Sequence, residues 1–474
     1  MNCKKPNGAL KMASNCLRAM ALGLTMIVAG CMLGPDFVPP SVEAPVEYRF
    51  GTDEAGIDVN LKWWELFDDP VLYELVTEAL DNNRDVKIAA SRIEEARAAL
   101  GFTRADQLPR VDIEGDARAG NFFGLNRSDT TDKAAFIAPA LSWEIDFWGK
   151  FRRSTEAAQA DLLASQYALR TVQLSLIAEV AGTYNRLLDF RRRLLIARKT
   201  LESRMQSLDL IQQRFNKGII PELDLNQAQI QFEIAAASVP QFQRQIAQTE
   251  NALSILLGRL PGAIQGGENI QYQAIPPDIP HGLPSSLLER RPDVADAKYR
   301  LQAQTARIGV AEALRLPSIS LTGLLGVASS ELSDRTSNGF VWNAGAGLSG
   351  SLFNFGKNQR RVEIEEAKTR QVLFFYENTV LTAFREVEDA LVAVETYKRQ
   401  VQAVNRQVRA ARNANDLSKD RYDQGITSYL EVLETERQLF SAELDYSDLS
   451  QQQMNAYVGL YKALGGGWQL RPNE

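Results

Sequence analysis

The stretch that decides the fold is residues 357–424, which read KNQRRVEIEEAKTRQVLFFYENTVLTAFREVEDALVAVETYKRQVQAVNRQVRAARNANDLSKDRYDQ and contain neither glycine nor proline. Residues 150–217 form a second run of 68 residues, interrupted only by Gly182. A continuous helix of that length would be on the order of 100 Å long, which no compact domain accommodates. Apolar residues recur every seven positions, which indicates supercoiled packing against neighbouring helices. These residues are Val180, Leu187, Leu194, Leu201, Leu208, Phe215, Val387, Val394, Val401 and Val408.

The chain repeats itself at an offset of about 207 residues. LPRVDIEG at 108–115 recurs as LPSISLTG at 316–323, and FWGK at 147–150 recurs as NFGK at 354–357. RFNKG at 214–218 recurs as RYDQG at 421–425, and LDL at 223–225 recurs as LEV at 430–432. We therefore predict two tandem repeats, residues 82–257 and 293–464, joined by a proline-rich linker over 258–292 and followed by a tail over 465–474.

Each repeat is predicted to contain a helix, a β-hairpin, a very long helix, a tight turn and a return helix. In the first repeat these are helix 82–107, hairpin 110–147 (110–124 paired with 133–147), long helix 150–217 and return helix 222–257. In the second they are a helix from 293, hairpin 317–353 (317–332 paired with 338–353), long helix 357–424 and return helix 427–464. The alternating hairpins fit a membrane β-barrel and a water-soluble hairpin equally well.

The N-terminus has the pattern of a lipoprotein signal. Lys4, Lys5, Lys11 and Arg18 precede a short apolar run over 19–28, which ends in Val28-Ala29-Gly30-Cys31. We predict a signal peptide over 1–30, lipidation of Cys31 and a lipidated N-terminal segment over 31–81. Ordinary cleavage, with Cys31 incidental, is the alternative. The anchor and the long helices favour the membrane reading of the hairpins.

Composition excludes several classes of function. The chain has one histidine and three cysteines, of which cleavage removes Cys3 and Cys16, so multi-histidine zinc sites and CxxC clusters are excluded and no metal or cofactor is predicted. His281 is predicted to be an exposed linker residue. The mature chain keeps 49 of the 53 basic residues against 59 acidic ones, a net charge of −10 that argues against binding nucleic acid. After residue 30 no apolar run is long enough for a spanning helix.

Four strands in lipid leave two open edges, which must be paired because unsatisfied backbone groups are costly there. Two chains would give eight strands and a filled bore, whereas three give twelve and a lumen. We therefore predict an α+β fold with two tandem structural repeats, in which a transmembrane β-barrel shared by three chains, four strands from each, continues into a long coiled-coil helical barrel.

The chain resembles the outer-membrane efflux protein family, the TolC-like trimeric outer membrane factors, and its lipid-anchored branch in particular. The motifs that carry the resemblance are GPDFVPP at 34–40, WWELFDDP at 63–70, GLPSSLLERRPDV at 282–294 and LEVLE at 430–434. The resemblance implies a homotrimer in the cell outer membrane that extends into the periplasm. It also implies docking on a periplasmic adaptor protein and an inner-membrane pump of the RND type, with small molecules such as drugs as cargo.

The predicted site is a periplasmic gate with no catalytic chemistry. Glu431 and Glu434 share one helix face, and in a three-fold tube each inward acid becomes a ring of three. The resemblance maps both onto the family's acidic constriction and maps Asp224 and Tyr422 onto contacts that close the tip. The family's gate arginine falls at Thr427, which cannot form the ion pair. Gly218 and Gly425 are the predicted turn hinges. The alternative is that Glu431 and Glu434 are solvated helix residues.

Two other functions stay open from the sequence, and an enzyme is not predicted. A structural coiled-coil lipoprotein without a pore would explain the anchor and the seven-residue periodicity but not the hairpins. The duct of a type I protein secretion system would share the architecture and differ in cargo. An enzyme is disfavoured because the chain has no nucleophile elbow, P-loop or GxGxxG motif.

Overall fold

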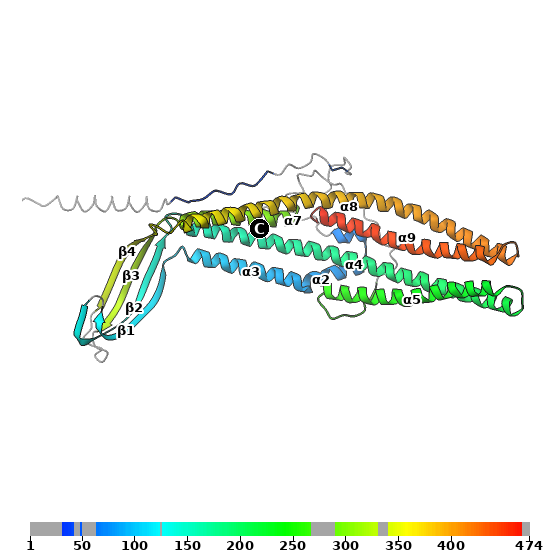
Figure 1. Ribbon diagram of the computed structural model, residues 1–474, viewed down its shortest axis with the longest axis horizontal. Helices are drawn as coiled ribbons and strands as arrows, with labels where there is room; N and C mark the ends of the chain where they lie inside the picture. The colour runs from blue at the N-terminus through cyan, green and yellow to red at the C-terminus, as the bar shows by residue number, and fades with distance from the viewer. Residues whose placement is uncertain are drawn as a thin grey trace, which may run out of the picture. The chain divides into compact units, whose positions relative to one another are not determined.

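The computed structural model describes residues 31–41, 48–49, 63–123, 126–266, 290–329 and 340–466. The predicted signal peptide, His281, most of the linker and most of the tail lie outside these residues. The described elements are η1 (Trp63–Phe67), α2 (Pro70–Asn82), α3 (Arg84–Ala105), β1 (Arg110–Phe123), β2 (Asn126–Ile145), α4 (Lys150–Asn216), α5 (Glu222–Leu256), α7 (Pro292–Ala313), β3 (Ser318–Ser329), β4 (Phe340–Ser349), α8 (Lys357–Asp423) and α9 (Tyr429–Ala463). All of them except η1 are labelled in Figure 1.

The described chain divides into two compact units, and each repeat contributes to both. Unit 1 comprises residues 1–41, 92–165 and 296–376, and unit 2 comprises residues 42–91, 166–295 and 377–474. Unit 1 holds the sheet and the adjoining parts of α3, α4, α7 and α8. Unit 2 holds η1, α2, α5, α9 and the remainder of the long helices. The division runs across the two long helices and not between the sequence repeats.

Both long helices form over the glycine- and proline-poor runs, and each spans 67 residues. All ten positions of the seven-residue pattern are buried or half-buried, as supercoiled packing requires. Val180, Leu187 and Val387 are fully buried. The return helix predicted over 427–464 begins two residues later, at Tyr429, because Ser428 has an extended backbone (φ −78, ψ 158).

The helix predicted over 82–107 is instead the second of two helices. Asn83 interrupts the run with ψ 137, and its Oδ1 accepts hydrogen bonds from the amides of Asp85 (2.8 Å) and Val86 (3.2 Å). Asparagine is a strong helix N-cap, so α3 starts at Arg84. The preceding helix α2 starts after Asp69, whose carboxylate caps it. That cap explains the Asp-Pro pair that ends the WWELFDDP motif.

The two short helices of each repeat meet at a junction. In the first repeat Asn83 Nδ2 donates to the carbonyl of Leu256, the last residue of α5 (2.9 Å). In the second repeat Arg291 Nη1 donates to the carbonyl of Ala463, the last residue of α9 (3.0 Å). Each junction therefore satisfies a carbonyl at a helix end that has no partner within its own helix.

The four strands form one antiparallel sheet in the order β1-β2-β3-β4. β2 begins at Asn126 and not at 133, because the hairpin pairs out to Phe123 and Asn126 after a register shift between Gly120 and Phe122. β4 ends at Ser349, opposite Ser318, and not at 353. Pro317 immediately precedes Ser318, and it has no amide hydrogen with which to extend the pairing of β3 and β4.

The register gives the sheet one apolar and one polar face. Paired residues of antiparallel strands point to the same side, so the pairs Val111–Leu141, Ile137–Val327 and Leu325–Trp342 all lie on one face. That apolar face is exposed in the single chain; its exposed members are Val111, Ile113, Ile137, Leu141, Leu325, Val327, Phe340, Trp342 and Leu348. The opposite face carries Asp112, Glu114, Ser142, Glu144, Ser318, Ser320 and Thr322. An exposed apolar surface of this extent marks a membrane or protein contact.

The Trp-Trp motif of the N-terminal segment closes the core of unit 2. Trp63 and Phe67 are fully buried in η1, and the Trp63 ring stacks on Tyr461 of α9 at 5.1 Å with an interplanar angle of 7°. A stacked aromatic pair of this kind contributes about 1 kcal/mol beyond its buried area. No helix among the described residues has the length and hydropathy needed to cross a bilayer.

Candidate functional site

The two predicted turns at Gly218 and Gly425 have the same backbone geometry. Their φ angles are +71 and +73, and an added Cβ would meet nothing within 4 Å at either position. Gly218 N–H donates to Phe215 (2.8 Å), and Gly425 N–H donates to Tyr422 (3.0 Å). The residue after each glycine bonds to the carbonyl five positions before it, which completes a Schellman motif. Glycine is therefore favoured at both turns because of the positive φ, and not because a side chain would meet a neighbouring atom.

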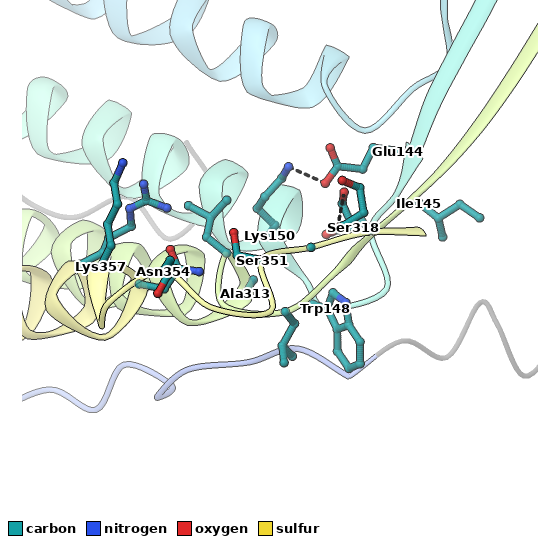
Figure 2. Close-up of a pocket in the computed structure, with 16 residues that line it drawn as sticks. Glu144, Ile145, Trp148, Lys150, Ala313, Ser318, Ser351, Asn354 and Lys357 are labelled. Atoms are coloured by element: carbon teal, nitrogen blue, oxygen red, sulfur yellow. Dashed lines mark hydrogen bonds and ion pairs between the residues drawn. The ribbon is translucent and has the colours of Figure 1, made fainter. Parts of the chain in front are cut away.

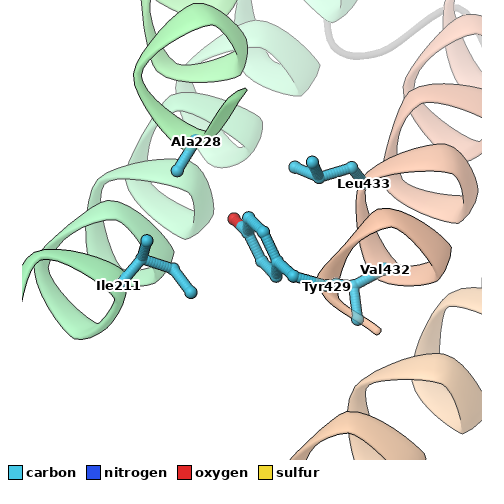
Figure 3. Close-up of a cluster of buried hydrophobic side chains, with 5 residues drawn as sticks. All are labelled: Ile211, Ala228, Tyr429, Val432 and Leu433. Carbon is cyan, nitrogen blue, oxygen red and sulfur yellow. The ribbon is translucent and has the colours of Figure 1, made fainter. Parts of the chain in front are cut away.

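A buried apolar cluster joins the two helical hairpins behind these turns. It contains Ile211 of α4, Ala228 of α5, and Tyr429, Val432 and Leu433 of α9. Figure 3 shows the Tyr429 ring lying between the two hairpins. Burial first, and then the nearby Glu436 carboxylate, raise the pKa of Tyr429 far above its usual value. The first and second repeats are thus packed together at the tip of one chain; we call these five residues the tip cluster.

Tyr422 lies at the edge of the tip cluster. Its ring is 5.3 Å from that of Tyr429, and the Arg214 guanidinium lies 4.8 Å from its centroid. Arg214 also lies 3.8 Å from Asp423, a second link between the hairpins. In the described part of the chain, the Tyr422 hydroxyl is buried without a hydrogen-bond partner.

Asp224 stands in the first turn of α5, where it is half-buried. Its amide donates to the carbonyl of Pro221 (3.1 Å), so its backbone is fixed at the start of the helix. Among the described residues no hydrogen bond or ion pair joins Asp224 to Tyr422. The structure therefore places both predicted gate residues at the tip but does not pair them within one chain.

Each of the two predicted constriction acids has partners within its own chain. Glu431 forms an ion pair with Arg421 (3.3 Å) and accepts a hydrogen bond from the Thr427 hydroxyl. Thr427, at the position where the resemblance places the family's gate arginine, is thus a neutral donor to the Glu431 carboxylate. Glu434 pairs with Arg437 and accepts from Gln438 (2.8 Å). Arg437 and Gln438 follow Glu434 by three and four residues, so this spacing on one helix face can be seen in the sequence itself.

A polar cavity of about 250 Å³ lies behind the tip cluster, between α4, α8 and α9. It is lined by Arg204, which is 3% exposed, and by Glu436, which is 7% exposed and lies 2.9 Å from Lys419. Burial lowers the pKa of Arg204, although the negative charge of Glu436 opposes that shift. Sequence reasoning missed this group because Arg204 precedes Lys419 and Glu436 by more than 200 residues.

A second cavity, of about 480 Å³, lies in unit 1 where the strands end and the long helices begin. Figure 2 shows Glu144, at the end of β2, reaching toward Lys150 in the first turn of α4. The ion pair between them measures 2.5 Å. Trp148 lines the same cavity and donates from Nε1 to the carbonyl of Pro317 (2.8 Å), which ties the β2–α4 turn to the start of β3.

The outer membrane efflux protein family matches residues 75–259 and 283–466, so each match overlaps one sequence repeat. The chain belongs to the outer membrane efflux protein family. It is similar to the solvent efflux pump outer membrane protein SrpC of Pseudomonas putida, at 34% identity over 96% of this chain and 99% of that one. It is also similar to the cation efflux system protein CusC of Escherichia coli O6:H1, at 35% identity over 95% and 98% of the two chains.

Solved structures agree with this membership. The outer membrane channel CmeC of Campylobacter jejuni superposes with a TM-score of 0.86 at 27% identity, over 93% of this chain and 96% of that one. The predicted resemblance, the α+β fold class and the outer-membrane location are confirmed. The protein is the outer-membrane channel component of an efflux system. Its family is one of transport proteins, whose members act as trimeric channels with adaptor and inner-membrane pump partners.

Proposed function

We propose that three copies of this chain form a gated passive duct from the periplasm to the exterior. The observation that carries the proposal is the sheet, whose apolar face is exposed and whose strands β1 and β4 each have one edge unpaired among the described residues. In lipid, each unpaired backbone group costs several kcal/mol, about the value of a lost buried hydrogen bond. Pairing β4 of one copy with β1 of the next removes these edges and closes a twelve-stranded barrel around a lumen.

The duct continues through the periplasm as a tube of long helices. Many positions of the seven-residue pattern are only half-buried in the single chain, among them Leu201, Leu208 and Val401. Helices of neighbouring copies would cover these positions and complete the supercoiled packing. Cys31 carries the lipid that attaches each copy to the outer membrane.

The tip formed by the two helical hairpins is the proposed gate. Gly218 and Gly425 act as hinges, because their exposed turns can change φ and ψ without a side-chain clash. Asp224 and Tyr422 close the resting tip by contacts between copies. The Tyr422 hydroxyl supports this role, since it is buried with no hydrogen-bond partner among the residues that the structure describes and a neighbouring copy can supply one.

Glu431 and Glu434 form the acidic constriction. Their side chains are 41% and 45% exposed, so they can be hydrated in a lumen. Arg421 and Arg437 offset part of the acidic charge, which reduces the repulsion among three copies of each acid. The net acidic charge makes the constriction selective for cations, and Arg421 and Arg437 reduce that selectivity.

The proposed partners are a periplasmic adaptor protein and an inner-membrane pump, and the proposed cargo is small molecules such as drugs or solvents. Relatives named for solvent, toluene and cation efflux are each 34–35% identical to the chain, which favours small-molecule cargo over protein secretion. In such a system the pump, and not the passive duct, selects the cargo. The choice among small molecules therefore depends on the pump.

Single-channel recording in planar bilayers tests the gate. The double variant Asp224→Ala, Tyr422→Phe removes both closing contacts, so we expect its resting conductance to rise above that of the unmodified trimer. The matched control is Asp81→Ala, Tyr397→Phe, which makes the same substitutions away from the tip and is expected to conduct as the unmodified protein does. Equal conductance in both double variants would remove Asp224 and Tyr422 from the gate, and a sealed bilayer with a stable monomer would refute the duct.

A further inference from the structure

The first described residues of the mature chain lie along unit 1 as an extended segment, residues 31–38, which we call the strap. Leu33 N–H donates to the carbonyl of Trp148 in the β2–α4 turn (3.3 Å). Met32 packs so closely on Gly149 that a Cβ at that glycine would lie 2.9 Å from the Met32 Cγ. The strap is therefore held against the turn that joins the sheet to the first long helix.

A buried arginine of α4 binds the strap through three acceptors. Arg153 is 1% exposed, and its Nε donates to the carbonyl of Leu33 (2.9 Å). Its Nη2 donates to the carbonyl of Gly34 (3.0 Å) and to the Asp36 carboxylate (2.7 Å). Its Nη1 pairs with Glu156, one turn along the same helix (2.8 Å). The strap supplies most of the acceptors that this buried charge requires.

Two glycines let the strap approach the helices closely. Gly34 has φ +86, and a Cβ there would lie 2.4 Å from the Cα of Gly309 in α7. A Cβ at Gly309 would lie 2.5 Å from the Leu33 carbonyl oxygen and 2.8 Å from Arg153 Cγ. No other residue fits at either position without displacing the strap. The close approach of Gly34 to Gly309 and the bond between Asp36 and Arg153 thus explain why the GPDFVPP motif has these two residues.

We propose that the groove formed by Gly149, Arg153 and Gly309 is a docking site for the lipidated strap, which fixes the acyl chains of Cys31 beside the end of the sheet. The proposal rests on the lipidation of Cys31. Leu33 is two positions after Cys31, a reach on the order of 7 Å. Trp148, which binds Leu33, follows the end of β2 by three residues. The docked strap therefore makes the lipid and the sheet enter the membrane as one unit, whereas an undocked strap would be a loose tether.

Electron paramagnetic resonance of a nitroxide on the strap tests the docking. Val38 is 77% exposed and makes a suitable labelling site, because Val38→Cys gives the only free thiol in a mature chain whose Cys31 is acylated. Each hydrogen bond from a charged donor shifts such a local equilibrium by about tenfold or more, so losing all three shifts docking by about a thousandfold. We expect Arg153→Met to convert an immobilised spectrum into a mobile one, while Arg370→Met on an exposed face of α8 leaves it unchanged.

A strap-side variant covers the case in which Arg153→Met does not fold. Gly34→Ala alters only the strap, and we expect it to mobilise the label as well, whereas Pro39→Ala, at an exposed position, should not. Incorporation of labelled fatty acid at Cys31 is measured in every variant, so a failure of lipidation is seen separately from a failure of docking. Immobilised spectra in both Arg153→Met and Gly34→Ala would overturn the docking site, whatever the acylation result.

Discussion

Replacement of Tyr429 by alanine tests whether the tip opens by separating the two hairpins of one chain. Tyr429 is 5% exposed and contacts Ile211 and Ala228 of the first repeat from its place on α9. Removing a buried aromatic side chain costs about 3–5 kcal/mol, because the transfer energy is lost and a cavity remains. If opening withdraws α9 from α4 and α5, this cost falls on the closed state only. A loss of 3 kcal/mol then favours the open state by roughly 150-fold in each chain.

The assay is single-channel conductance of purified trimers, with thermal unfolding measured on the same samples. We expect Tyr429→Ala to raise the open probability and Tyr429→Phe, which keeps the ring, to leave it unchanged. Tyr461→Ala is the matched control: Tyr461 is also buried in α9, but it stacks on Trp63 away from the tip. It should lower the Tm without raising conductance. Closed channels in Tyr429→Ala with a lowered Tm would show that the hairpins of one chain move together.

Three further outcomes are expected. Glu431→Gln with Glu434→Gln should shift the reversal potential in a KCl gradient toward zero, because the constriction loses its acidic charge; an unchanged potential would place both residues outside the lumen. Gly425→Ala should lower the free energy of unfolding by about 1 kcal/mol, since only the positive φ is strained; a loss above about 3 kcal/mol by denaturant titration would contradict the open space there. Burial raises the pKa of Glu365, but hydrogen bonds from Lys368 and Gln304 outweigh it and leave the pKa below its usual 4.5. The resulting stability is present above that pH and lost as pH falls through the lowered pKa, so Glu365→Gln should flatten the acid limb of the Tm–pH curve, and parallel curves would count against it.

The sequence predicted the long helices well because their ends depend on local chemistry. Gly218 and Gly425 end them by a left-handed backbone that few other residues adopt, and the intervening runs have almost no residue that breaks a helix. The break at Asn83 was missed, since an asparagine within a polar helical run has no local mark that distinguishes a cap from a solvated position. Its role depends on Leu256, a residue 173 positions away.

The candidate site was predictable only in part for the same reason. The pairing of Glu434 with Arg437 follows helical spacing and could have been read from the sequence. The tip cluster, in contrast, combines Ile211 with Tyr429, and the strap docks on Arg153 from 117 residues away. Contacts of this kind depend on how distant segments pack. The seven-residue periodicity shows which face of a helix is packed, but not which residues it packs against.

The two helix junctions carry different chemistry at corresponding places, an amide at Asn83 and a guanidinium at Arg291. Arg291 also binds Asp293 (2.6 Å) and Glu386 (2.7 Å), so the second junction is an ionic network whereas the first is neutral. The two sequence repeats therefore hold corresponding helix ends together by different chemistry, and the ionic network of the second is centred on the buried Arg291, which is 6% exposed. A ring of three such chains would alternate neutral and ionic joints around its circumference, so it would keep three-fold symmetry while the two halves of each chain remain distinguishable.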